Sequence, residues 1–227
     1  MGCIGAHAIG LERGSDRLIS LNEPLLYRDL KGIAGYVLDL LDIGRMRFCN
    51  PHALTKFFII NSLRQRTGAR TFIEAGTNKG TTAARCARVF ERVVTVELDA
   101  DLARTSTRFL RNRSNVLVVC GDALSVIPRV IESQRLDRIL VFLDAHAPLW
   151  GTANGGPPEP ALDELNRLAD YKDRICGVIV DDFRNFGAAP GFPSRSCLVS
   201  AAEAFCADGD FTFNVHLDQL IIERKRP

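Results

Sequence analysis

The sequence has little of the features that mark membrane, secreted or disulfide-bonded proteins. No apolar run reaches the roughly 18 residues that a membrane span needs, and the opening residues MGCIGAHAIG lack the basic start and long apolar stretch of a secretory signal. The seven cysteines are odd in number, scattered and free of any C-x-x-C pair, which favours a reducing compartment and a structural role. We therefore expect a cytoplasmic protein with no membrane partner.

An excess of one charge is missing as well. Lysine and arginine number 29 against 27 aspartates and glutamates, a net charge of +2. This balance gives no broad electropositive field, so a nucleic-acid partner is disfavoured. Apolar residues make up 46% of the 227 positions, enough to fill one sizeable core. We expect one folded unit with a small-molecule partner.

Helical spacing dominates the first part of the chain. Apolar residues recur at intervals of three and four between Asn22 and Phe48, which predicts a helix. A second helix is predicted to open at Asn50, as its cap, with Pro51 in the first position, and to end near Gly68. We expect residues 1–69 to form a helical cap against the edge or mouth of the main sheet.

Strand and helix patterns then alternate through residues 70–227. Five short, β-branched apolar runs predict strands: TFIEA, RVVTVEL, NVLVVC, RILVFLDA and GVIVDD, starting at Thr71, Arg92, Asn115, Arg138 and Gly177. Helix-compatible stretches between them start at Thr81, Asp101, Ala123 and Ala161. Strands that are apolar throughout and separated by helices indicate a parallel sheet covered on both faces, a doubly wound α/β fold.

The chain closes with a different pattern. A helix predicted near Cys197 to Cys206 leads to FTFNVHLDQLIIER, which contains two strand patterns with a tight reversal around Leu217, Asp218 and Gln219. Two strands joined this closely have no room for a helical crossover, so they must pair antiparallel. The prediction is a terminal antiparallel hairpin.

A glycine-containing turn follows the first predicted strand. The candidate cofactor residues in TFIEAGTNKGTTA are Glu74, Gly76, Thr77, Asn78 and Gly80. Glycine lets the backbone approach a ligand closely, and the N–H groups at the next helix start suit a carboxylate. Taken alone, the segment also suits a tight strand-to-helix turn that binds nothing.

Two further strand ends carry matching chemistry. Glu97, followed by Leu98, ends the second strand about twenty residues after the glycines and can accept both hydroxyls of an adenosine ribose. Asp99 is more typical of a helix cap. After the third strand come Gly121, Asp122 and Ala123, where the aspartate can accept from an adenine amino group. Ligands of open α/β sheets bind beyond the carboxyl ends of the strands, so the three segments are expected to converge.

These motifs resemble those of class I S-adenosylmethionine-dependent methyltransferases, from about Thr71 to the C-terminus. EAGTNKG, VVTVELD, GDA and FLDAH are similar to the first four motifs, and the closing segment is similar to the family's terminal hairpin. The resemblance implies a seven-stranded Rossmann-like sheet, S-adenosylmethionine as cofactor and methyl transfer as activity. Asn78 stands where the common pattern has a middle glycine, a departure that bears on the shape of the loop.

Two other classes stay open. An acidic residue after the second strand also suits the ribose of NAD, so a nicotinamide-dependent oxidoreductase is one alternative. It fits less well, because the spacing is G-x-x-x-G rather than G-x-G-x-x-G and the GDA element and hairpin have no role in it. A methyltransferase-like domain that binds the nucleoside without catalysis is the other.

Carboxylates are dense at the next two strand ends. Asp144 follows the fourth strand, and Asp181 and Asp182 follow the fifth. Neighbouring like charges are costly unless a cation neutralises them, and Mg²⁺ prefers oxygen ligands. The pattern resembles metal-dependent O-methyltransferases, including those that act on sugar hydroxyls of antibiotics. That resemblance implies that the three aspartates hold a divalent ion. Alternatively, Asp144 contacts only the cofactor, and the pair forms turn and cap residues.

His146 is the candidate general base, since a histidine two residues from Asp144 can take a proton from a substrate hydroxyl near neutral pH. Trp150, in the glycine- and proline-rich stretch after it, can stack on a sugar or aromatic acceptor or pack on the surface. No N-P-P-Y or D-P-P-Y motif follows the fourth strand, which again disfavours nucleic acid. We expect a small hydroxyl compound as acceptor. A homo-oligomer is compatible with the sequence, which specifies no oligomeric state.

Overall fold

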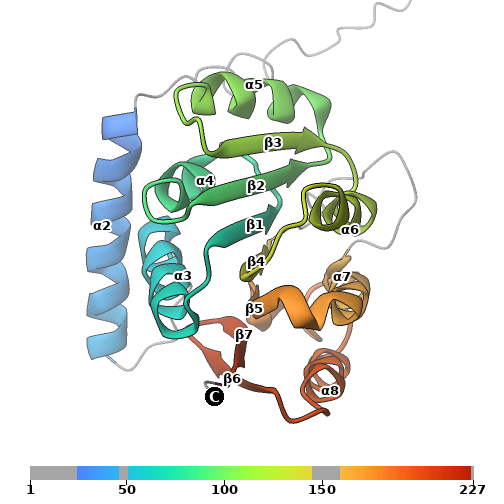
Figure 1. Cartoon of the computed structure of the whole chain (residues 1–227). Coiled ribbons are helices and arrows are strands. Elements are labelled where there is room, and N and C mark those ends of the chain that lie inside the picture. Colours follow the sequence, from blue (N-terminus) through green and yellow to red (C-terminus); the bar gives the residue numbers. More distant parts are fainter. Residues whose placement is uncertain (1–24, 46–50, 145–158, 226–227) are drawn as a thin grey trace, which may run out of the picture.

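The computed structural model describes residues 25–45, 51–144 and 159–225. A seven-stranded sheet with the order β3-β2-β1-β4-β5-β7-β6 runs through the middle of the molecule (Figure 1). The strands are β1 Thr71–Ala75, β2 Arg92–Glu97, β3 Val116–Cys120, β4 Ile139–Leu143, β5 Ile175–Val180, β6 Phe211–His216 and β7 Gln219–Arg224. The helices are α2 Leu25–Gly44, α3 Ala53–Thr67, α4 Thr81–Cys86, α5 Ala100–Leu110, α6 Ala123–Ser133, α7 Ala161–Leu168 and α8 Arg195–Phe205, with 3₁₀ turns at Ala169–Arg174 and Phe183–Asn185.

The sheet confirms the predicted doubly wound architecture and its hairpin. β1 to β5 pair in parallel, whereas β7 pairs antiparallel with both β5 and β6. The reversal between β6 and β7 is formed by Leu217 and Asp218, with φ of 44° and 68°. Two successive residues with positive φ form a two-residue hairpin turn, whose twist matches that of the strands on either side. The central strands β1, β4 and β5 are buried along their whole length, as expected of a sheet covered on both faces.

Two apolar layers separate the sheet from its helices. Helices α3, α4 and α5 cover one face, with Ile60, Leu63 and Leu110 packed against Phe72 and Phe142 of the strands. Helices α6, α7 and α8 cover the opposite face through a second cluster whose helical members include Ile127, Leu165 and Leu198. No described helix is long and apolar enough to cross a membrane.

Helix α3 corrects two expectations about the segment before the sheet. It covers a face of the sheet instead of its edge, since Ile60 and Leu63 are completely buried in the core. It begins at Ala53 with His52 in the N-cap position, and Asn50 lies outside the described residues. The carboxylate of Asp39 in α2 accepts a hydrogen bond from the His52 backbone N–H at 2.9 Å, so the start of α3 is fixed by another helix. The predicted end at Gly68, with φ of 66°, is confirmed.

Helix α2 is a helix, as its spacing predicts, but its polar side faces the protein. Its buried residues are Arg28, Gly32, Gly35 and Asp39. A Cβ added to Gly32 would lie 2.6 Å from the Arg85 guanidinium, so the glycine permits close packing there. Arg28 donates to the backbone carbonyl of Lys79 at 2.7 Å. The aliphatic residues of α2 that therefore point away from the molecule, each 42–56% exposed, are Leu30, Ile33, Val37, Leu38, Leu40, Leu41 and Ile43.

Candidate active site

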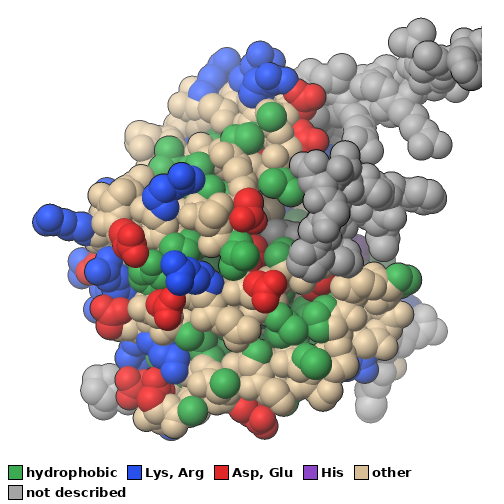
Figure 2. All heavy atoms as spheres, turned by 90° about the vertical axis from the view of Figure 1, so that its right-hand side faces the viewer, with side chains coloured by type: hydrophobic (Ala, Val, Ile, Leu, Met, Phe, Trp, Pro, Cys, Tyr) green, Lys and Arg blue, Asp and Glu red, His purple; other side chains and the backbone are tan. Residues whose placement is uncertain are grey.

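The sequence-predicted site residues come together along one edge of the sheet, at the carboxyl ends of its parallel strands. The strand ladder continues past the strand ends: Gly76 N–H donates to Val96 C=O at 2.9 Å, Asp144 N–H to Ala75 C=O at 3.1 Å and Asp181 N–H to Leu143 C=O at 3.0 Å. Gly121 N–H likewise donates to Glu97 C=O at 2.9 Å. These ends therefore form a row about 19 Å long from β3 to β5. This edge faces the viewer in Figure 2, where acidic side chains lie near its middle.

The loop after β1 has the backbone shape that the glycines predict. Gly76 and Gly80 have φ of 93° and 69°, values that favour glycine. Asn78 has a φ of 46°, and asparagine is among the few other residues that adopt this left-handed conformation readily. The departure from the common glycine pattern therefore keeps the same kind of turn. Thr77 is buried beneath the loop, its hydroxyl 2.6 Å from that of Thr95.

Glu97 connects the second strand to this loop. Its carboxylate accepts hydrogen bonds from the backbone N–H of Asn78 at 2.7 Å and of Asp99 at 3.0 Å. Each carboxylate oxygen can accept a further bond, so the group can still take ligand hydroxyls. Leu98 beside it is exposed. Asp99 accepts from the N–H groups of Asp101 and Leu102, which confirms it as the cap of α5.

Glu74 lies deeper, inside the sheet beneath the loop. Burial raises the pKa of its carboxyl from 4.5 to about 8, opposed by a hydrogen bond from Thr95 and reinforced by the charges of Asp144 and Glu97. The Thr95 hydroxyl donates to Glu74 Oε2 at 2.6 Å. Glu74 therefore supports the site from below.

The third segment begins α6. Gly121 has a φ of 153°, and Asp122 occupies the N-cap of α6, where its side chain accepts from Leu124 N–H at 3.3 Å. Ala123 is the first helical residue and is buried. The pairing of Glu97 with Cys120 places this segment next to the Glu97 carboxylate. Contact of Asp122 with an adenine ring stays a prediction.

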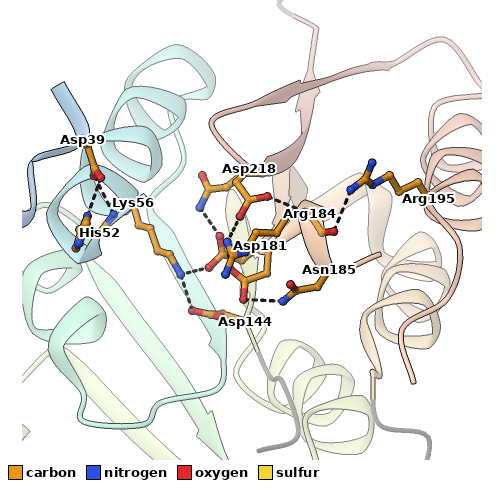
Figure 3. A network of polar contacts seen from close by, with 11 residues as sticks. Asp39, His52, Lys56, Asp144, Asp181, Arg184, Asn185, Arg195 and Asp218 are labelled. Atoms are coloured by element: carbon orange, nitrogen blue, oxygen red, sulfur yellow. Dashed lines mark hydrogen bonds and ion pairs between the residues drawn. The ribbon is translucent and has the colours of Figure 1, made fainter. Parts of the chain in front are cut away.

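An acidic cluster lies at the carboxyl ends of β4 and β5, and the Lys56 ammonium lies within it (Figure 3). The Lys56 side chain extends from α3 and forms an ion pair with Asp181 and a second one with Asp144, at 3.5 Å. Asp181 is 0% exposed, and its other carboxylate oxygen accepts from Gln219 Nε2 at 3.0 Å. Burial acts to lower the pKa of Lys56, but the charges of Asp181 and Asp144 outweigh it and raise the pKa above its ordinary value.

Asp182 pairs with a different cation, the Arg184 guanidinium. With a φ of 54°, it places its carboxylate 3.1 Å from the Arg184 guanidinium, which also pairs with the buried Asp218. The Asn185 side-chain amide donates to Asp182 at 3.3 Å. The predicted magnesium ligands thus face two protein cations: Lys56 pairs with Asp144 and Asp181, and Arg184 pairs with Asp182. Within the described ranges, no three His, Cys, Asp or Glu side chains form a group that could hold a metal ion.

Comparison with known proteins gives a clear fold assignment. No protein-family model matches the sequence, and no curated protein matches it either. Among solved structures, an O-methyltransferase from Bacillus cereus in complex with S-adenosylhomocysteine has a TM-score of 0.56 at 19% identity, covering 76% of this chain and 81% of the other. The class I methyltransferase fold is present. The TomG O-methyltransferase of Streptomyces achromogenes, involved in tomaymycin synthesis and bound to S-adenosylmethionine, gives 0.55 at 20% identity, with 76% and 80% covered. Methyltransferase PaMTH1 of Podospora anserina, bound to S-adenosylhomocysteine, gives 0.55 at 15% identity, with 98% and 100% covered.

Sequence reasoning missed Lys56, which this methyltransferase fold brings to the strand ends. Lys56 lies one turn into α3, in ALTKFFII, where it is the only charged residue among apolar ones. That position is the one local signal that could have drawn attention to it. The start of α3 is anchored to α2, because the Asp39 carboxylate accepts from His52 and from the Thr55 hydroxyl. This network fixes the turn from which Lys56 extends.

The stretch after Asp144 contains two residues that the sequence predicts to act in the site. His146, the candidate base, and Trp150, the candidate stacking residue, lie outside the described residues. Asp144, two positions before His146, directly follows β4, and its side chain is 26% exposed. The roles of His146 and Trp150 stay predictions.

Proposed function

We propose that this chain transfers the methyl group of S-adenosylmethionine to a hydroxyl of a small molecule. The observation that supports this most directly is the buried carboxylate of Glu97, the last residue of β2. It accepts a hydrogen bond from the Asn78 N–H and so holds the glycine-containing loop after β1. A carboxylate in this place suits the two ribose hydroxyls of an adenosine. The fold, shared with structures bound to S-adenosylmethionine or S-adenosylhomocysteine, supports this choice of nucleoside.

The residues along the edge fit such a cofactor in their chemistry. Left-handed backbone at Gly76, Asn78 and Gly80 opens the loop to close approach, and Leu98 offers exposed apolar surface for an aromatic ring. Residues proposed to hold the cofactor are Glu74, Gly76, Thr77, Asn78, Gly80, Glu97, Leu98, Gly121, Asp122, Ala123 and Asp144. When bound, S-adenosylmethionine supplies the methyl group. The protein's own part is to orient the acceptor beside it and to receive the hydroxyl proton.

The acceptor is proposed to bind on the β4 and β5 side of the edge. Lys56 and Asp144 lie there, next to the cofactor segments. His146 remains the proposed base, from its place two residues after Asp144. Magnesium does not fit the described aspartates, because the Lys56 ammonium pairs with Asp144 and Asp181 and the Arg184 guanidinium pairs with Asp182, where a metal ion would lie. The net charge of +2 favours a small acceptor over nucleic acid.

Calorimetry with S-adenosylhomocysteine tests the binding site. Wild-type protein is expected to bind it, and Glu97→Gln or Glu97→Ala to weaken binding at least about tenfold, because a hydrogen bond to a charged group contributes about 1.5–3 kcal/mol. Asp99→Ala is the matched control: it removes a neighbouring carboxylate that caps α5 and should leave the affinity unchanged. NAD binding in place of S-adenosylhomocysteine would favour an oxidoreductase.

Catalysis needs a separate readout, because a non-catalytic subunit would bind the nucleoside equally well. Labelled S-adenosylmethionine is incubated with the protein and a small-molecule cell extract. Label is expected in an extract compound when protein is present, and Glu97→Ala should reduce it in proportion to lost binding. Tight binding with no transfer from any extract would support the non-catalytic alternative.

A further inference from the structure

Resting on the proposed function, we propose that the Lys56 ammonium binds the acceptor oxygen in the position where a divalent ion was expected. The site is built by three elements: Lys56 from α3, Asp144 from the end of β4 and Asp181 from the end of β5. The two aspartates are the same side chains that would have served as magnesium ligands. The chemical class of the ligand is a hydroxyl or alkoxide oxygen of a small molecule.

The position of Lys56 is fixed by contacts on both sides. Asp181 is completely buried between Lys56 and Gln219, so its carboxylate has little freedom to turn toward another cation. Asp39 holds the first turn of α3 through His52 and Thr55, four and one residues before Lys56. A cation anchored at both the helix and the carboxylate costs little reorganisation when a substrate arrives.

The geometry leaves capacity for a ligand. An ammonium has three N–H donors, and the two carboxylates engage at most two of them. The Lys56 side chain is 17% exposed, and Asp144 beside it is 26% exposed, so the pair is reached from the open edge of the sheet. The third N–H can donate to an acceptor oxygen and favour its negative charge, which a divalent ion would otherwise do.

Mn²⁺ binding followed by electron paramagnetic resonance tests the replacement. Wild-type protein is expected to bind no Mn²⁺ at these aspartates. Lys56→Ala should create a site, since Mg²⁺-like ions are often held by one or two carboxylates and several waters. Lys56→Ala combined with Asp181→Asn should lose that site again. Wild-type binding that Asp181→Asn removes, or no gained binding in Lys56→Ala, would overturn the proposal.

A methyl-transfer assay tests whether Lys56 acts on the acceptor. Methyl transfer into the extract is expected to survive exhaustive chelation in the wild type and to fall about 100-fold or more in Lys56→Met, which keeps the side-chain length. Calorimetry with S-adenosylhomocysteine should be the same for both proteins. Loss of wild-type transfer on chelation would contradict the role of Lys56. Failure of S-adenosylhomocysteine to bind would refute the proposed function instead, and the Mn²⁺ result would still decide about Lys56.

An independent observation concerns the outer side of α2. We infer that this surface pairs with α2 of a second copy of the chain. Leu30, Ile33, Val37 and Leu40 are 56, 51, 48 and 48% exposed. Their spacing of three, four and three residues is that of a two-helix seam. In Figure 1, α2 stands at the outside of the molecule, next to α3.

The seam is complementary to itself, so we expect its partner to be a second copy of the same helix. If two copies of α2 cross antiparallel about Gly35, Leu30 faces Leu40 and Ile33 faces Val37, so one two-fold axis satisfies all four. The same direction places Lys31 of one copy toward the end of the other copy that carries Asp42. Phe58 of α3, 44% exposed and in edge-to-face contact with Tyr36 of α2, extends this apolar surface beyond the helix.

Light scattering coupled to size-exclusion chromatography tests this pairing. Wild-type protein is expected to run at twice the mass of one chain, and Ile33→Glu/Val37→Glu at the mass of one. Val215→Glu on β6 is the matched control, an exposed apolar residue outside the seam that should leave the dimer intact. A monomeric wild type would overturn the inference. So would a dimer that survives the double substitution with unchanged circular dichroism.

Discussion

Asp181→Leu is expected to lower the free energy of unfolding by about 3–5 kcal/mol, because it leaves the Lys56 ammonium in a largely buried position without its closest carboxylate. The substitution also strands the Gln219 amide, which donates to Asp181 at 3.0 Å. Urea unfolding at neutral pH measures the loss. Glu91→Ala removes an exposed carboxylate paired with Arg70 and should change stability by no more than about 0.5 kcal/mol.

The double variant Lys56→Met/Asp181→Leu separates charge from packing. Replacing both members of a buried ion pair by apolar residues of similar size is often neutral or stabilising. We therefore expect the double variant to recover most of the stability that Asp181→Leu loses. A double variant as unstable as the sum of the two single variants would show that the ion pair does not couple these residues.

Glu74→Gln is expected to remove a large dependence of stability on pH. The pKa of the buried Glu74 is raised from 4.5 to about 8, so between these values the folded protein holds a proton that the unfolded chain has released. Stability from this group is therefore fully present below about pH 4.5 and is lost as the pH rises toward 8. The loss amounts to roughly 4–5 kcal/mol at most.

Urea unfolding from pH 5 to 9 measures this effect. Wild-type stability is expected to fall across the range, and Glu74→Gln to follow a flatter course and to exceed the wild type above about pH 8. The amide keeps the shape of the carboxyl and can still accept from the Thr95 hydroxyl. Glu91→Gln, on the surface, serves as control and should keep the wild-type slope. Parallel curves for the wild type and Glu74→Gln would contradict the buried, protonated state.

The proposed dimer seam and the acidic cluster both depend on the N-terminal helices α2 and α3. Asp39 links α2 to the start of α3, and α3 carries Lys56 into the site. The outward apolar side of α2 is the other face of the same helix. Binding of a second copy and positioning of Lys56 are thus both expected to depend on how firmly α2 is held.

Local sequence determined the sheet and the row of strand ends along its edge. Runs such as TFIEA and RVVTVEL are short and rich in apolar and β-branched residues, a pattern typical of a strand buried on both faces. Gly76 and Gly80 lie in the turn between strand and helix where the sequence predicted it, and the hairpin followed from the tight reversal around Leu217 and Asp218. Register then placed Glu97 beside the loop, because the carboxyl ends of parallel strands share one edge.

Tertiary structure alone decided which cation meets the aspartates and which side of α2 faces outward. Lys56 and Asp181 are 125 positions apart, and Arg184 and Asp218 are 34 apart, so no local pattern links them. From sequence, three neighbouring carboxylates predicted a divalent ion, and nothing in the spacing along the chain pointed to Lys56. Apolar spacing in α2 indicated a helix, but its polar side docks on Arg85 and His52 through contacts that exist only once both helices are packed. Charge neutralisation and helix orientation depend on distances through space, which spacing along the chain does not encode.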